Sequence, residues 1–208
     1  MARGGRDGQA AGLRGGDLLG KACRGLGRGE PPPADRGPGA RRARGNRTGR
    51  IFTGDRSGDW LFASLYRTGF AVQETSVHAG DGQRLVGARM LASVRCAPPA
   101  NKPLPEEKAA CYPWLQREIE LVADSVRVVV ALGGYAWQAM WPALKDAGYG
   151  LPRSRPPFGH GVEVPVAYGE SQVTLIGCYH PSQQNTFTGR VTAQMLDDIF
   201  HRAANIAK

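Results

Sequence analysis

The sequence predicts an α/β protein with a mainly parallel sheet, and two observations lead to this prediction. Strand-like runs of β-branched residues alternate with helix-like segments along residues 46–208, the order expected when helices cover a parallel sheet. A dense polar loop follows an apolar run near the end of the chain, and open α/β sheets bind ligands at the carboxyl ends of their strands. A chain of 208 residues with 41% hydrophobic residues can form one domain with a real core.

Residues 1–45 differ from the rest of the chain. They contain thirteen glycines and four prolines but no aromatic residue, valine or isoleucine. Such a segment cannot bury a core, so we expect it to be disordered. Its ten basic and four acidic residues give +6 of the total net charge of +9. The basic character that would attract a polyanion is therefore concentrated in this segment.

Three interpretations of this segment stay open: an arginine-rich arm for nucleic acid, a solvated linker, and a translation in the wrong reading frame. The genetic code favours the third. When each new codon takes the last two bases of one codon and the first base of the next, residues 33–44 permit Leu-Leu-Ile-Val-Gly-Leu-Ala-Pro-Ala-Ala-His-Gly. That sequence is a buried strand followed by a glycine turn. We therefore expect a frameshift product at residues 1–45 and a folded domain at residues 46–208.

The folded part opens with a polar loop at residues 46–59, whose glycines permit tight turns. Its one aromatic residue, Phe52, could be an ordinary core residue. We expect a helix at residues 60–68, capped by Ser57 or Asp59, because both residue types favour the N-cap position.

Strands and helices alternate in the middle of the chain. A proline in the first turn and two glutamates near the positive end predict the helix that opens at Pro105. The β-branched run at residues 126–132 predicts a central strand. The glycine turn that follows lacks G-x-G-x-x-G spacing, which favours a structural role. In chain order we expect one or two strands at 84–95, a helix at 105–123, a strand at 126–132, a helix at 135–146, paired strands at 162–167 and 173–176, and a helix at 192–204.

The polar loop at residues 177–189 is dense in groups that can donate to phosphates and to the edge of a base. On the residues alone, a simple polar turn is equally acceptable, and the second polar loop at residues 46–59 favours a binding role. We expect His160, in an earlier turn, to be structural. The candidate residues of the 177–189 loop are His180, Ser182, Gln183, Gln184 and Asn185.

The four cysteines do not form a disulfide framework in a chain of this length. Cys96 and Cys111 are usually explained as two buried thiols, because an iron–sulfur cluster needs four thiolates. No apolar run reaches the length of a membrane span, and no secretory signal precedes the domain. We therefore expect a soluble cytoplasmic protein without a membrane partner.

Three motifs together resemble the type-5 (family 5) uracil-DNA glycosylases, and the resemblance covers residues 46 to about 204. They are Asn-Arg-Thr-Gly-Arg-x-Phe-Thr-Gly-Asp-x-Ser-Gly from Asn46, Val-Arg-Cys-Ala-Pro-Pro-x-Asn-Lys-Pro from Val94, and Cys-Tyr-His-Pro-Ser-Gln-Gln-Asn-Thr-Phe-Thr-Gly-Arg from Cys178. The resemblance implies a single three-layer αβα domain. It also implies a base-excision repair enzyme that flips uracil out of DNA and hydrolyses the N-glycosidic bond.

The resemblance also implies roles for single residues. Phe52 is expected to stack on the flipped uracil, and His180 to donate to a uracil oxygen as the base leaves. Asp55 is expected to orient water and to stabilise the sugar cation, although aspartate at this place is more commonly a cap or turn residue. Asn101 is a weaker candidate for contact with DNA or base. The residues expected at the duplex are Ser182, Gln183, Gln184 and Asn185.

The family carries a [4Fe–4S] cluster on four cysteines, and Cys96 and Cys111 match the second pair. The first pair, a C-x-x-C, is missing from residues 1–45 as written, and so is the family's catalytic glycine loop. We therefore expect this chain to lack a complete cluster and site, and to be an inactive form of an active parent.

The implied partners are double-stranded and single-stranded DNA that contains uracil, bound by a monomer. Ala92 stands where related families place an asparagine that recognises uracil. This difference implies looser base selection, which extends to other deaminated bases. Two alternatives stay open: a non-catalytic DNA-binding remnant, and an unrelated α/β protein that binds nucleotides or performs redox chemistry.

Overall fold

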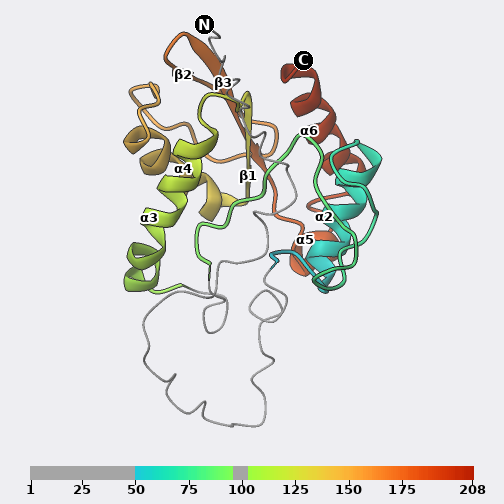
Figure 1. The fold of residues 1–208 in the computed structure, drawn as a ribbon. Coiled ribbons are helices and arrows are strands. Elements are labelled where there is room, and N and C mark those ends of the chain that lie inside the picture. The colour runs from blue at the N-terminus through green and yellow to red at the C-terminus, as the bar shows by residue number, and fades with distance from the viewer. Residues whose placement is uncertain (1–49, 96–102) are drawn as a thin grey trace, which may run out of the picture.

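The computed structural model describes residues 50–95 and 103–208. The expectations for residues 1–45, for Cys96 and for Asn101 lie outside the described residues. The elements in chain order are α2 (Arg56–Arg67), α3 (Pro105–Val122), β1 (Val128–Leu132), α4 (Gly134–Asp146), β2 (Glu163–Tyr168), β3 (Ser171–Cys178), α5 (Gln183–Phe187) and α6 (Ala193–Ile206) (Figure 1). No helix in this part of the chain combines the length and the apolar character needed to cross a membrane.

The sheet has the strand order β1-β3-β2 within the described residues. β1 is parallel to β3, and β2 forms an antiparallel hairpin with β3. Most of the predicted elements are present, but the sheet is mixed, with one pair of each kind, rather than mainly parallel. The prediction that residues 126–132 form the central strand is wrong for the described sheet. β3 takes that place because its side chains are buried on both faces, whereas β1 is mostly half-buried.

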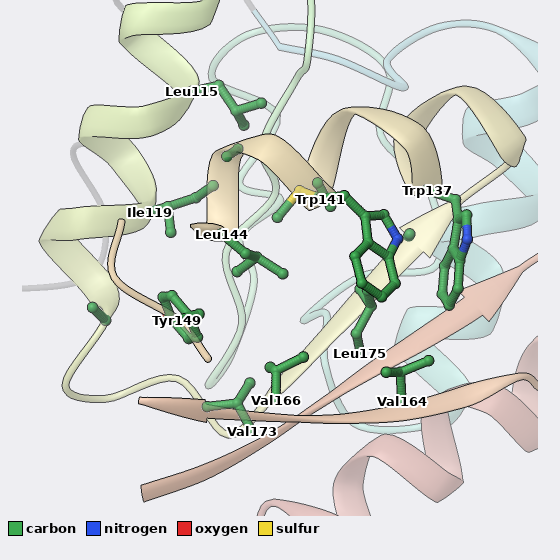
Figure 2. Packing of buried hydrophobic residues seen from close by; sticks show 14 residues of the cluster. Leu115, Ile119, Trp137, Trp141, Leu144, Tyr149, Val164, Val166, Val173 and Leu175 are labelled. Carbon is green, nitrogen blue, oxygen red and sulfur yellow. The ribbon is translucent and has the colours of Figure 1, made fainter. Parts of the chain in front are cut away.

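Helices cover both faces of the sheet, so the predicted three-layer αβα arrangement is confirmed. Figure 1 shows α3 and α4 on one side of the sheet and α2 and α6 on the other. The α3–α4 side packs Trp137 and Trp141 of α4 on the strands, with the two ring centroids 6.0 Å apart (Figure 2). Leu175 of β3 belongs to this cluster, and the next residue, Ile176, belongs to the cluster under α2 and α6. Both side chains have no exposed surface.

The beginning of α2 corrects one prediction. The helix starts at Arg56, and its N-cap is Asp55, whose Oδ1 accepts a hydrogen bond of 2.8 Å from the N–H of Gly58. Ser57 and Asp59, the predicted caps, lie inside the first turn. Several polar residues in this loop favour an N-cap, and only the extended backbone of Asp55 places its carboxylate against the free N–H groups.

The predicted strands at residues 84–95 are wrong. Within the described residues this segment forms one isolated bridge, between Ala71 and Leu85, and no strand. Leu85 and Met90 pack on the α2–α6 cluster, whereas Leu91 packs on the α3–α4 cluster. The segment thus contacts both clusters, and the bridge to Ala71 is the only strand-like pairing it makes within the described residues.

Candidate functional site

Phe52 and His180 lie together, although they are far apart in the sequence. Phe52 precedes α2 and His180 follows β3, and their ring centroids are 5.4 Å apart at an angle of 35°. Gly133, which follows β1, lies against the same histidine: a Cβ added there would be 3.2 Å from the Cβ of His180. The carboxyl ends of the two parallel strands therefore meet at this point, as the sequence predicts.

The backbone of Phe52 is held in an unusual conformation. Its φ of 54° is the only positive value at a non-glycine residue in the described chain, and such strain costs about 1–3 kcal/mol. The first turn of α2 packs directly on this residue. A Cβ added to Gly58 would lie 2.1 Å from the carbonyl oxygen of Phe52, so only glycine fits there.

Asp55 combines a structural and an electrostatic role. Its Oδ1 caps α2, and a carboxylate has a second oxygen that can hold a water molecule. Its negative charge acts on His180, where it opposes the larger effect of burial on the histidine pKa. The cap therefore fixes a carboxylate beside the Phe52–His180 pair.

The surroundings of His180 keep its ring neutral at neutral pH. Burial lowers the pKa of His180, and the nearby charge of Asp55 raises it by less. Its Nδ1 is buried and has no hydrogen-bond partner within the described residues. Its carbonyl oxygen accepts two bonds of 2.8 Å, from the side chain of Asn185 and from the N–H of Ser182. A neutral imidazole carries one N–H, which can donate to a substrate oxygen.

The four residues predicted to meet the duplex fall into two kinds. Ser182 caps α5, and Asn185 binds the carbonyl of His180. Both side chains thus build the loop that holds the histidine. Gln183 and Gln184 are exposed in the first turn of α5. These two remain the better candidates for contact with an external ligand.

Two arginine–aromatic contacts at the same loop were not singled out by the sequence analysis. The guanidinium of Arg56 lies 4.6 Å from the ring centre of Phe187, and that of Arg190 lies 4.8 Å from the ring centre of Tyr179. Phe187 is 66% exposed. One signal was present in the sequence, the aromatic Phe187 within a polar loop. Arg56 of α2, which lies over this ring, is distant in the sequence.

His160 has the structural role that the sequence predicts. Its Nδ1 accepts a hydrogen bond of 3.1 Å from the N–H of Tyr179, directly before His180. Burial lowers the pKa of His160, so this ring is also neutral and can accept the bond. The pair fixes the backbone that leaves β3.

The described residues supply one thiol for the predicted cluster. Cys111 is half-buried on α3 and accepts a bond of 3.4 Å from the N–H of Arg95, the residue before Cys96. Cys178 is fully buried, and burial raises its pKa to about 12, which argues against a ligand role. Within the described ranges, no group of three or more histidine, cysteine or acidic residues could hold a metal ion. These residues alone therefore do not form a cluster site.

Comparison with known proteins gives a consistent family. A type-5 uracil-DNA glycosylase of Mycobacterium bovis is 55% identical over 163 residues, which cover 78% of this chain and 58% of that protein. The corresponding proteins of Mycobacterium leprae and Thermus thermophilus are 52% and 44% identical over 162 residues, covering 68% and 69% of their own lengths. The chain therefore spans between about half and about two thirds of these relatives.

The family model of the uracil DNA glycosylase superfamily matches residues 36–204. This match covers most of the chain, and it includes both polar loops, every described strand and every described helix except the last two residues of α6. The chain therefore belongs to the uracil DNA glycosylase superfamily and, within it, to the type-5 family.

Proposed function

We propose that the chain carries the active site of a DNA repair glycosylase that hydrolyses the bond between uracil and deoxyribose. The observation that supports this proposal is the meeting of Phe52, Asp55 and His180 at the carboxyl end of β3. An aromatic ring, a carboxylate and a neutral histidine are the three groups that the reaction needs.

The reaction breaks the C1′–N1 bond, and its electron pair leaves with the base. The sugar becomes cation-like and the base anion-like in the transition state. The carboxylate of Asp55 stabilises the cation and accepts a proton from the water whose oxygen bonds to C1′. The N–H of neutral His180 donates to the uracil oxygen, where negative charge develops. Phe52 stacks on the base and holds it outside the duplex.

The proposed main substrate is uracil in double-stranded or single-stranded DNA. Other deaminated bases are proposed as secondary substrates. Arg56, Arg190 and the exposed amides of Gln183 and Gln184 support this choice, because phosphate contacts dominate the affinity of proteins for DNA. We propose that the protein acts as a monomer in the cytoplasm.

Two variants, made in the protein whose reading frame is restored, test the assigned chemistry. Asp55→Asn keeps an N-cap residue but removes the charge, and we expect single-turnover release of uracil to fall ~10²–10⁴-fold. His180→Ala removes the donor, and we expect a fall of ~10²–10³-fold. Binding to uracil-containing duplex should change little in either variant. Asp59→Asn and His201→Ala alter exposed residues of the same types and serve as matched controls.

The same experiment decides between two functions. Release of uracil by the protein whose reading frame is restored, lost in both of its variants, supports the glycosylase. Binding of DNA without any release, in that protein as well as in the present chain, supports the non-catalytic DNA-binding remnant. Equal rates for the variants and the restored protein would show that the assigned roles are wrong.

We also propose that Cys96 and Cys111 are two of the four ligands of a [4Fe–4S] cluster in the parent protein. The hydrogen bond from the N–H of Arg95 to the sulfur of Cys111 supports this role, because such bonds tune cluster thiolates. In a protein whose reading frame is restored, Cys111→Ser should remove iron, measured by metal analysis and visible absorbance. Cys178→Ser should retain it. Stoichiometric iron in the present chain would show that the assigned ligands are wrong.

A frameshift at residues 1–45 is the last part of the proposal. The relatives align over 160–163 residues, and the segment 46–208 has 163. The family match begins at residue 36, so it does not itself mark a boundary at residue 46, and the codons of residues 33–44 decide the question. Sequencing the gene tests this directly: a stop codon in the shifted frame between residues 18 and 44 excludes it.

A further inference from the structure

We propose that Asp81 is a positioning residue, which holds Phe52 and Asp55 in place through a network of hydrogen bonds that runs from a partly exposed loop into the buried Thr53–Ser76 pair. The network consists of Asp81, Arg50, Ser76 and Thr53, and we refer to it as the Asp81 network. The proposal rests on the proposed function, because it concerns the placement of the residues assigned to that site. Asp81 itself lies in the loop that follows α2 and does not touch the Phe52–His180 pair.

The carboxylate of Asp81 is bound on both oxygens. Oδ1 accepts bonds of 2.9 Å from Arg50 Nη1 and from the N–H of Gln83. Oδ2 accepts bonds of 2.8 and 3.2 Å from the N–H groups of Val77 and His78. Burial by itself raises the pKa of Asp81, but these donors together hold it well below its usual range. Asp81 is therefore a fixed anion at neutral pH.

The Asp81 network extends from this carboxylate to the loop before α2. Arg50 Nη1 also donates to Ser76 Oγ at 2.9 Å. Ser76 Oγ lies 2.8 Å from Thr53 Oγ1, and the carbonyl of Ser76 accepts a bond of 2.8 Å from the N–H of Gly54. The side chains of Thr53 and Ser76 are at most 1% exposed. These contacts hold the loop on both sides of Phe52.

This arrangement explains how the positive φ of Phe52 persists. A strained residue keeps its conformation only where its surroundings determine it. Arg50 precedes Phe52, and Thr53 and Gly54 follow it directly, so the network fixes the chain at both ends of the strained residue. Asp55 comes next and caps α2. Loss of Asp81 should therefore displace both the ring and the carboxylate.

The test uses Asp81→Asn, in which one oxygen becomes a donor that opposes the N–H groups of Val77 and His78. Hydrogen exchange of single amides, followed by NMR, should show the amide of Gly54 exchanging about tenfold faster or more, as in local opening. The amide of Leu196 in α6 should be unchanged. In the protein whose reading frame is restored, single-turnover uracil release should fall roughly 10–10²-fold, as small misplacements do, while the Kd for uracil-containing duplex stays within about twofold.

Two further variants complete the design. Ser76→Ala removes only the hydroxyl between Arg50 and Thr53, and it should give the same changes at a smaller size. It serves as the test if Asp81→Asn fails to fold. Glu163→Gln breaks another carboxylate–arginine pair, in which Glu163 Oε1 accepts a bond of 2.7 Å from Arg202 Nε. This pair lies away from the loop that holds Phe52. This control should leave both the Gly54 amide and the release rate unchanged.

Each outcome decides the proposal. Unchanged exchange at Gly54, or faster exchange there with normal release, overturns it. A uniform increase of exchange that includes Leu196 shows a general stabilising role and also overturns it. If the protein whose reading frame is restored releases no uracil, the glycosylase proposal fails, and the exchange at Gly54 still decides whether Asp81 holds the loop.

Discussion

His180 illustrates how single residues of the site depend on their surroundings. Burial keeps its ring neutral, and the loop residues Ser182 and Asn185 fix its backbone. The position of the Asp55 side chain is likewise fixed by its hydrogen bond as the N-cap of α2. The chemistry proposed for both residues therefore depends on ordinary structural interactions of the same side chains.

The lowered pKa of His180 predicts a dependence of stability on pH. Between its folded pKa and the usual value of about 6.5, the unfolded chain binds more protons than the folded chain. Stability is therefore complete above about pH 6.5 and falls as the pH drops toward the folded pKa. Urea unfolding at about pH 7.5 and pH 5.5 should show a smaller difference in His180→Gln than in the unaltered chain. The exposed His201→Gln should retain the full difference; an equal loss in both variants contradicts the assignment.

Phe187 should matter for binding and not for stability. Its ring is 66% exposed and lies under the guanidinium of Arg56. An exposed ring beside a cation can stack on a base, which is worth about 1–3 kcal/mol. Phe187→Ala should keep the Tm and weaken binding to uracil-containing duplex, measured by fluorescence anisotropy. Tyr66→Ala removes another exposed aromatic ring, 49% exposed at the far end of α2, and should bind DNA normally; equal weakening in both would contradict the role of Phe187.

The beginning of α2 is the element on which the site is built. Asp55 caps this helix, and Gly58 in its first turn lets the carbonyl of Phe52 approach. The helix thus fixes two of the three proposed site residues. A change in its first turn should affect the site more than a change of equal size elsewhere.

Gly58→Ala tests this dependence. The added Cβ would lie 2.1 Å from the carbonyl oxygen of Phe52, so the loop or the helix must shift, at a cost of about 1–3 kcal/mol. Urea unfolding should show this loss. Gly150→Ala provides the control, because its added Cβ would meet Ala167 at an ordinary 3.5 Å. An unchanged unfolding midpoint in Gly58→Ala would show that the close approach does not constrain the loop.

At the scale of the whole molecule, β3 joins the two halves of the core. Its successive residues Leu175 and Ile176 face the α3–α4 and the α2–α6 clusters. The same strand leads to His180. The stability of both layers and the position of the site therefore depend on one strand.

We expect Leu175→Ala and Ile176→Ala each to lower the free energy of unfolding by about 2–5 kcal/mol, because both side chains are fully buried. Since the clusters share β3, each variant should shift one common transition. Circular dichroism and tryptophan fluorescence, followed together in urea, check this. Trp137 and Trp141 report on the α3–α4 side, and Trp60→Phe in the background removes the tryptophan that packs on the α2–α6 side. Separate transitions for the two probes would show that the layers unfold independently.

The sequence alone determined the order of most elements, whereas the residues proposed for the site come from its resemblance to the type-5 family. Local patterns determine the order of the elements: the β-branched run before Gly133, the proline that opens α3 and the polar loop after β3 each depend on neighbours along the chain. The tertiary structure decided which strand is central in the described sheet, which aspartate caps α2, and that residues 84–95 form one isolated bridge instead of strands. The contacts from which we infer the role of Asp81 also come from the tertiary structure, because the bonds that hold Phe52 join two loops that are separate in the sequence. Such contacts follow from packing, and no local pattern records them.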